Sequence, residues 1–144
     1  MNNRESVYIS LTSISSNQER LYQTLTSIIS QSIRPDKIFL FLSEEPYILD
    51  KGFKDKKITS GNLLNLIKNN SIIEIKWTKN IGSYRKLLPL LKEKWEEDCM
   101  IITIDDDTVY HNKLIENLII DYNNHKCVIG YRGFLPLFRD FNDF

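Results

Sequence analysis

Three consecutive aspartates, Asp105, Asp106 and Asp107, are the residues whose types and spacing most clearly indicate chemistry. They follow the apolar run at residues 101–104 directly. Like charges this close repel one another, and ionised carboxylates beside a hydrophobic core are unfavourable. Three explanations account for such a cluster: a bound divalent cation, a phosphoryl-transfer reaction, or a cap on the helix that follows.

A divalent cation explains the cluster best. Mg²⁺ and Mn²⁺ prefer hard oxygen ligands, commonly one or two carboxylates together with water and a substrate phosphate. The alternating residues Asp105 and Asp107 can reach one ion, and the ion offsets their repulsion. We therefore expect Asp105 and Asp107 to bind Mn²⁺ or Mg²⁺.

Two other interpretations of the aspartates stay open. A single aspartate near a helix N-terminus gains from the helix dipole, so one of the three could serve as a cap. The string IITIDDDTV also satisfies the hhhhDxDx(T/V) pattern of haloacid dehalogenase phosphatases, with Asp105 as nucleophile and Asp107 as acid and base. That motif belongs on the first strand of its fold, whereas here it follows the fourth predicted strand.

Composition restricts the class of protein. The chain has 144 residues, 42% hydrophobic and 26% charged, as expected for one globular domain. Its nineteen basic and nineteen acidic residues cancel, so we expect no nucleic-acid partner. Apolar runs fall far short of the ~20 residues that span a bilayer, and no segment of signal-peptide length precedes the first strand. We expect a cytoplasmic protein without an integral membrane segment.

Predicted strands and helices alternate along the sequence. The expected strands span residues 6–13, 37–45, 71–77, 98–104 and 127–133. The expected helices span residues 17–33, 60–70, 83–95 and 111–125. This alternation predicts an α/β, Rossmann-like fold with a mostly parallel sheet and helices on both faces.

Single residues refine these elements. Asn17 and Ser60 are placed to cap the first two helices. Pro89 lies inside the third helical pattern, so that helix is expected to kink or to start late. Cys99 and Cys127 each stand at the start of an apolar run, which is typical of reduced core residues.

Polar residues follow three of the predicted strands. Thr12 and Ser13 end the first strand, residues 43–45 end the second, and residues 105–107 follow the fourth. In parallel sheets, ligands bind beyond the carboxyl ends of the strands. We therefore expect these groups to share one binding edge.

The chain resembles the family 2-like glycosyltransferases, which have a GT-A nucleotide-sugar-binding fold. The matching segments occur in the family's order and cover nearly the whole chain: YISLTS, FLFLSEE, NIGSYRKLLPLL, IITIDDDTVY and VIGYRG. In some relatives the third segment contains DxGPxTKLLP. Here Asn80 replaces the acid, and Ser83 and Arg85 replace proline and threonine. Gly82 and Lys86 are kept.

This resemblance implies a metal-dependent glycosyltransferase. It would transfer a sugar from a nucleoside-diphosphate sugar, UDP- or GDP-linked, to a glycan or another hydroxyl acceptor. Asp107 would be the direct metal ligand, Asp105 a ribose or water-mediated metal contact, and Asp106 a support for either. The metal would neutralise charge on the departing diphosphate. By family analogy alone, the role would be assembly of bacterial-type surface glycans.

The resemblance also implies contacts after the Gly82 turn. Arg85 and Lys86 would meet the phosphates or the base near the start of a helix. Both residues have a structural alternative, because basic side chains are mostly solvated surface residues.

Further nucleotide contacts would come from the first two strand ends. Thr12, Ser13 and an acid at Glu44 or Glu45 would hold the base and ribose by hydrogen bonds. Alternatively, Thr12 and Ser13 terminate a strand by local backbone bonding, and the glutamates belong to an exposed turn.

The catalytic base is not identified. In such relatives it comes from the half of the domain after the aspartates, which also builds the acceptor site, and that half is almost absent here. We divide the sequence into a nucleotide-sugar-binding domain at 1–133 and an aromatic tail at 134–144, the start of a missing acceptor-binding part. No motif supports Asp140 or Asp143 as the base. A non-catalytic nucleotide-sugar-binding module is the alternative function, and the aromatic tail indicates a partner chain or self-association.

Overall fold

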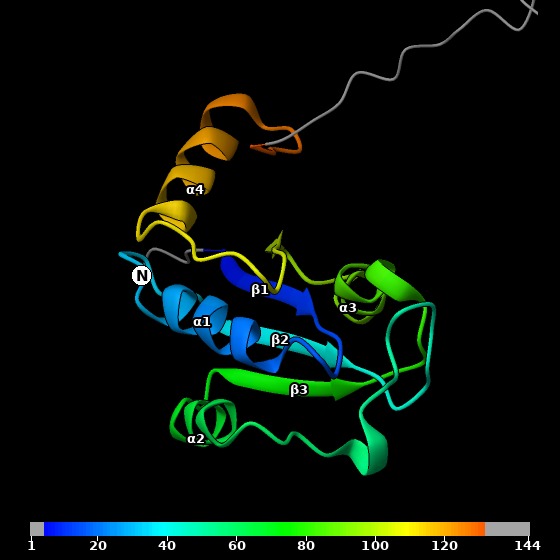
Figure 1. Ribbon diagram of the computed structural model, residues 1–144. Coiled ribbons are helices and arrows are strands. Elements are labelled where there is room, and N and C mark those ends of the chain that lie inside the picture. The colour runs from blue at the N-terminus through cyan, green and yellow to red at the C-terminus, as the bar shows by residue number, and fades with distance from the viewer. Residues whose placement is uncertain (1–4, 132–144) are drawn as a thin grey trace, which may run out of the picture.

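The computed structural model describes residues 5–131, and within them four strands form one all-parallel sheet in the order β3-β2-β1-β4 (Figure 1). The strands are β1 (Ser6–Thr12), β2 (Lys37–Leu42), β3 (Ile73–Trp77) and β4 (Cys99–Thr103). Ile9 of β1 lies between Ile38 of β2 and Ile102 of β4. The near-continuous apolar run of β2 is buried on both faces, as expected for an inner parallel strand. The expected α/β, Rossmann-like fold is confirmed.

Helices cover both faces of the sheet. They are α1 (Gln18–Ile29), α2 (Gly61–Asn69), α3 (Leu88–Glu93) and α4 (Leu114–His125), with the 3₁₀ helices η1 (Lys54–Lys56) and η2 (Gly82–Lys86). Leu25 of α1, Leu63 of α2 and Ile115 of α4 are fully buried in one cluster on one face. Leu90 of α3 is buried against Tyr8 on the other face. No helix within residues 5–131 is long and apolar enough to cross a membrane.

Of the two predicted helix caps, one makes its side-chain hydrogen bond and the other does not. Ser60 accepts a hydrogen bond from the backbone N–H of Leu63 at 3.3 Å, so its cap is confirmed. Asn17 occupies the N-cap position of α1 but makes no side-chain cap bond. Its Nδ2 instead donates to Oδ2 of Asp106 at 2.7 Å. A capping residue of the right type is therefore used to hold the aspartate loop.

The predicted helix at 83–95 is α-helical only over α3. Pro89 stands in the first turn of α3, where a missing N–H leaves no helical bond broken, so the late start is confirmed. The preceding residues form η2. Trp95 lies beyond the end of α3 and is 75% exposed, whereas Leu90 supplies the buried contact.

The predicted fifth strand is wrong over the residues that the structure describes. Helix α4 ends at His125, the following residue Lys126 has the left-handed conformation, and residues 127–131 are irregular. Val128 is completely exposed, and Cys127 is exposed rather than in the core. A short apolar triplet forms a strand only where a neighbouring backbone supplies a ladder, and within residues 5–131 no strand pairs with this segment. The end of that strand and the tail at 134–144 lie outside the described residues.

Candidate functional site

The carboxyl edge of the sheet gathers the residues that the sequence singles out. Thr12 ends β1, and Ser13 follows it. Glu44 and Glu45 follow β2, and the aspartates follow β4. Helix η2 begins beside these loops and packs against β1 and β2. The polar residues predicted from the sequence therefore share the carboxyl edge of the sheet, but each group contacts different neighbours.

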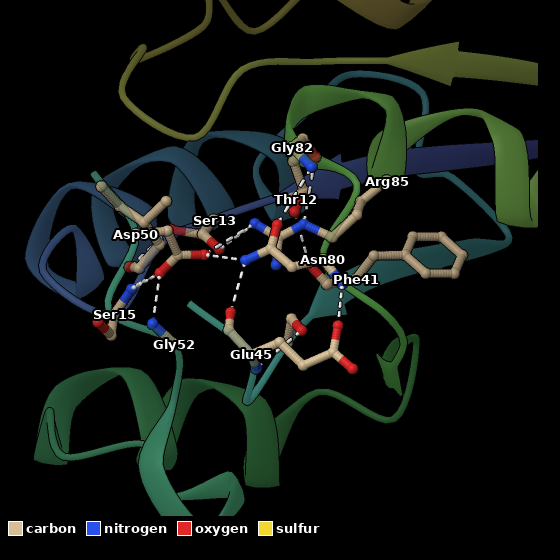
Figure 2. A network of polar contacts seen from close by, with 12 residues as sticks. Thr12, Ser13, Ser15, Phe41, Glu45, Asp50, Gly52, Asn80, Gly82 and Arg85 are labelled. Atoms are coloured by element: carbon tan, nitrogen blue, oxygen red, sulfur yellow. Dashed lines mark hydrogen bonds and ion pairs between the residues drawn. The ribbon is translucent and has the colours of Figure 1, made fainter. Parts of the chain in front are cut away.

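A buried ion pair lies at the centre of this edge. Nη2 of Arg85 lies 3.1 Å from Oδ2 of Asp50, with the two side chains only 2% and 4% exposed (Figure 2). The same nitrogen donates to the carbonyl of Ser13 at 3.4 Å, and Nε donates to the carbonyl of Gly82 at 3.2 Å. Arg85 is therefore not a solvated helix residue. Its buried Nη1 has no hydrogen-bond partner among the described residues.

Asp50 is a site residue that sequence reasoning missed. Besides Arg85, it accepts hydrogen bonds from the backbone N–H groups of Gly52 at 3.0 Å and Ser15 at 3.4 Å. Nδ2 of Asn80 donates to it at 3.0 Å. These donors compensate a carboxylate that burial would otherwise disfavour. Asp50 stands in an irregular segment without periodicity or motif, so the sequence carried no signal for it.

Asn80 connects two loops at the carboxyl edge of the sheet. Its Nδ2 also donates to the carbonyl of Glu45 at 2.7 Å, and its Oδ1 accepts the N–H of Gly82 at 3.1 Å. Its backbone N–H donates to Oε2 of Glu45 at 2.9 Å. An aspartate at this position would lose both Nδ2 bonds and would repel Asp50. The amide therefore joins the loops after β2 and β3 because it both donates and accepts.

The remaining predicted contacts after β1 and β2 are also engaged. Oγ1 of Thr12 donates to the carbonyl of Phe41 at 2.8 Å, so it links the ends of β1 and β2. Glu44 is exposed and lies 3.6 Å from Nζ of Lys56. The hydroxyl of Ser13 is buried and donates to Asp106. Of these side chains, Glu44 is the one most open to solvent.

The three aspartates have three different environments. Asp106 is half-buried and accepts hydrogen bonds from Ser13 and Asn17, so it fixes the loop to β1 and α1. Oδ1 of Asp105 lies 2.6 Å from Nζ of Lys86, and that carboxylate is 66% exposed. Asp107 is exposed, and its one described contact is a 3.5 Å hydrogen bond from Thr108. Asp106 is therefore structural, while Asp105 and Asp107 face solvent.

Tyr110 holds the aspartate loop in place. Its Oη accepts the backbone N–H of Asp105 at 2.9 Å. Burial raises the pKa of this phenol above its ordinary value of 10.0. Thr24 on α1 donates to the carbonyl of Thr108 at 2.9 Å, which fixes the other end of the loop. Both exposed carboxylates are thus mounted on a supported backbone.

Asp105 and Asp107 can supply only part of the ligands that a divalent cation needs. Across the described part of the chain, no three Asp, Glu, His or Cys side chains converge as a ready-made metal site. Mg²⁺ or Mn²⁺ needs only one or two protein carboxylates when water and phosphate supply the other ligands. Asp107 can supply one, and Asp105 a second on leaving Lys86. The donor set therefore fits an ion that arrives with a phosphate ligand.

A cleft of about 930 Å³ adjoins these carboxylates and runs beside β4. Lys86, Asp105 and Tyr110 line its polar part, and Leu91 of α3 and Leu118 of α4 belong to its apolar flanks. Charged groups of both signs thus line a cleft that also has apolar walls.

Comparisons with known proteins leave the family of this chain open. No protein-family model matches the sequence, and no curated protein matches it.

Proposed function

We propose that this chain binds a nucleoside-diphosphate sugar together with Mn²⁺ or Mg²⁺, as the donor-binding part of a glycosyltransferase. The pair formed by Lys86 and Asp105, with Asp107 exposed beside it, is the observation that carries this proposal. It offers a diphosphate one ammonium group and offers a cation two carboxylates at a single strand end. Both kinds of group are needed, because the ammonium group binds the negative diphosphate and the carboxylates bind the positive metal ion.

Lys86 and Asp105 would exchange partners when the donor binds. Lys86 is 28% exposed, so its ammonium can turn from Asp105 to a phosphate oxygen without leaving a buried charge unpaired. Asp105 is then released towards the cation or the ribose. A bound cation would neutralise negative charge on the diphosphate as it departs. Asp106 would keep the loop in place through Ser13 and Asn17.

The base and ribose would lie over the ends of β1 and β2. Arg85 supports this location indirectly, because its ion pair with Asp50 holds the loop after β2 against η2 at that edge. Glu44 is exposed at the same edge and can accept from ribose hydroxyls. Thr12 keeps free acceptor capacity while it donates to β2.

The proposed reaction is transfer of the sugar to a hydroxyl acceptor on a glycan. It needs a general base, for which the described residues supply no motif, and Asp140 and Asp143 lie outside them. A chain that binds the donor without transfer would be the non-catalytic module. The free thiols of Cys99 and Cys127 suit a reducing compartment, so the proposal includes a cytoplasmic location.

Calorimetric titration with UDP and GDP, each with and without Mn²⁺, tests the donor site. We expect metal-dependent binding of one nucleotide, weakened at least ~10-fold in Asp107→Asn because one direct ligand is lost. Asp121→Asn on α4 is the matched control and should bind as the wild type does. A folded wild-type protein that binds neither nucleotide would contradict the proposal. Hydrolysis of small phosphate esters by the wild type would favour the phosphatase instead.

A further inference from the structure

The turn between Tyr47 and Asp50 presents two hydrophobic side chains to solvent. Ile48 is 86% exposed and Leu49 is 85% exposed. The turn is closed from both sides, because the N–H of Tyr47 donates to the carbonyl of Asp50 at 2.8 Å and the N–H of Asp50 returns the bond at 2.9 Å. The two side chains therefore form a fixed apolar tip rather than part of an irregular loop.

Ile48 does not serve the fold. Its φ is 52°, in the left-handed region that glycine and asparagine tolerate and that a β-branched side chain strongly disfavours. Its side chain gains no burial in return. An exposed residue held in an unfavourable conformation points to a function outside folding.

The apolar tip is rigidly mounted. Asp50 at its base is buried and is bonded to both Arg85 and Asn80 in the network of Figure 2. The ring of Tyr47 packs so closely on Gly82 that a Cβ there would lie 3.0 Å from it. A tip held in this way loses little conformational freedom on binding, which favours docking.

Further apolar side chains are exposed around the base of the tip. Tyr47 is 46% exposed, and Ile81 and Tyr84, on either side of Gly82, are 39% and 68% exposed. Tyrosines have an apolar ring and a polar hydroxyl, and they are enriched where a bilayer meets water. The surface around the tip therefore has the composition of an interfacial contact.

Four lysines, here called the basic collar, lie on the loop that carries the tip or beside a residue bonded to it: Lys51, Lys54, Lys57 and Lys79. All four are exposed, and in the described structure none has an acidic partner within 4.0 Å. Lys51 directly follows the turn. Lys79 directly precedes Asn80, whose side chain donates a hydrogen bond to Asp50 of the turn. Two acids of this region are paired with a cation, Asp50 with Arg85 and Glu44 with Lys56. Glu45 and Asp55 keep their negative charges, because the bond that Glu45 accepts comes from the neutral backbone of Asn80. The four lysines outnumber these two acids. The collar therefore leaves a net positive charge around an apolar tip.

We propose that the tip inserts Ile48 and Leu49 into the surface of an anionic lipid bilayer, with the basic collar on the lipid headgroups. One apolar signal binds membranes only marginally, and apolar insertion combined with basic residues binds more firmly. Two side chains and four lysines give reversible, salt-sensitive binding. This inference does not rest on the proposed function. It orients the carboxyl edge of the sheet towards the bilayer, because the tip belongs to the loop after β2.

Vesicle co-sedimentation of the full chain tests this proposal. The probes are vesicles of phosphatidylcholine alone and of phosphatidylcholine mixed with phosphatidylglycerol. We expect the wild type to bind the anionic vesicles, with added salt releasing it. The double variant Ile48→Asn, Leu49→Asn should bind at least ~10-fold more weakly, because two apolar side chains no longer leave water. Lys51→Gln combined with Lys79→Gln should lower binding to anionic vesicles by about 10-fold.

Matched variants separate docking from folding. Asparagine tolerates the left-handed conformation of Ile48, so Ile48→Asn should leave the melting temperature unchanged or raise it. Val128→Asn removes an equally exposed apolar side chain elsewhere and should not affect vesicle binding. Equal binding of the double variant and the wild type, or no binding of the wild type to anionic vesicles, overturns the proposal. If the wild type binds no vesicles but is a dimer, and the double variant is a monomer, then a second copy of the chain contacts the tip instead of a bilayer.

Discussion

Nη2 of Arg85 lies 3.1 Å from Oδ2 of Asp50, and this buried contact joins two loops that are 35 residues apart in the sequence. The pair fixes the loop after β2 against helix η2. It also sets the position of Lys86, the next residue, whose ammonium reaches Asp105 at the end of β4. The arrangement of the carboxyl edge therefore depends on one ion pair that is itself hidden from solvent.

Breaking this pair should destabilise the fold strongly. Asp50→Asn leaves the buried guanidinium of Arg85 without a counter-charge, and the expected loss in the free energy of unfolding is about 3 kcal/mol. Urea denaturation measures it. Lys56→Met removes an exposed pair with Glu44 and should change stability by less than about 1 kcal/mol. Equal effects of the two substitutions would show that burial of Asp50 has no energetic consequence.

Lys86 should matter for binding and little for stability. Lys86→Met removes a partly exposed pair with Asp105, so we expect a loss of less than about 1 kcal/mol in unfolding. Nucleotide affinity should fall at least ~10-fold, because a charge-assisted bond to phosphate is lost. Calorimetry and thermal unfolding of the same preparation measure both. Lys92→Met on α3 is the control. The prediction fails if Lys86→Met leaves nucleotide affinity unchanged, or if it destabilises the protein as strongly as loss of a buried ion pair would.

Gly52 should not tolerate a side chain. Its φ is 75°, and a Cβ would lie 2.0 Å from the backbone oxygen of Glu44, so Gly52→Ala must displace the loop that carries Asp50. We expect a loss of more than about 1 kcal/mol in the free energy of unfolding. Gly61 at the start of α2 meets nothing within 4 Å. Gly61→Ala should therefore stabilise the protein by up to about 1 kcal/mol, and a stable Gly52→Ala protein would refute the argument.

Tyr110 should contribute to alkaline unfolding. Burial raises the pKa of its phenol above 10.0, so the folded state holds the proton more tightly than the unfolded state. Its contribution to stability is complete below the unfolded pKa and is lost as the pH rises through the folded pKa. Tyr110→Phe should make the decline in melting temperature above pH ~10 shallower. Tyr131→Phe, at an exposed tyrosine, is the control, and identical pH profiles of Tyr110→Phe and wild type would count against this role.

Periodicity alone predicted most of the fold. The four described strands and the alternation with helices follow from apolar runs, because burial against a parallel sheet demands such runs locally. The location of residues 105–107 beyond β4 follows from the same reasoning. The predicted fifth strand at 127–133 was wrong in its described part, since a strand also needs a neighbouring backbone that no local pattern reveals.

The contacts of the site were decided only by the tertiary structure. The sequence left Arg85 either a nucleotide contact or a solvated surface residue and gave no distinction to Asp50, whereas folding brings their loops together and buries both. It also separates three adjacent aspartates, turning Asp106 towards Ser13 and leaving Asp105 and Asp107 exposed. Local sequence determined which elements form, because burial and spacing act over a few residues. The pairing of charged side chains depends on loops that are far apart in the sequence. Only the packed sheet brings these loops together, so the tertiary structure decided which charges meet.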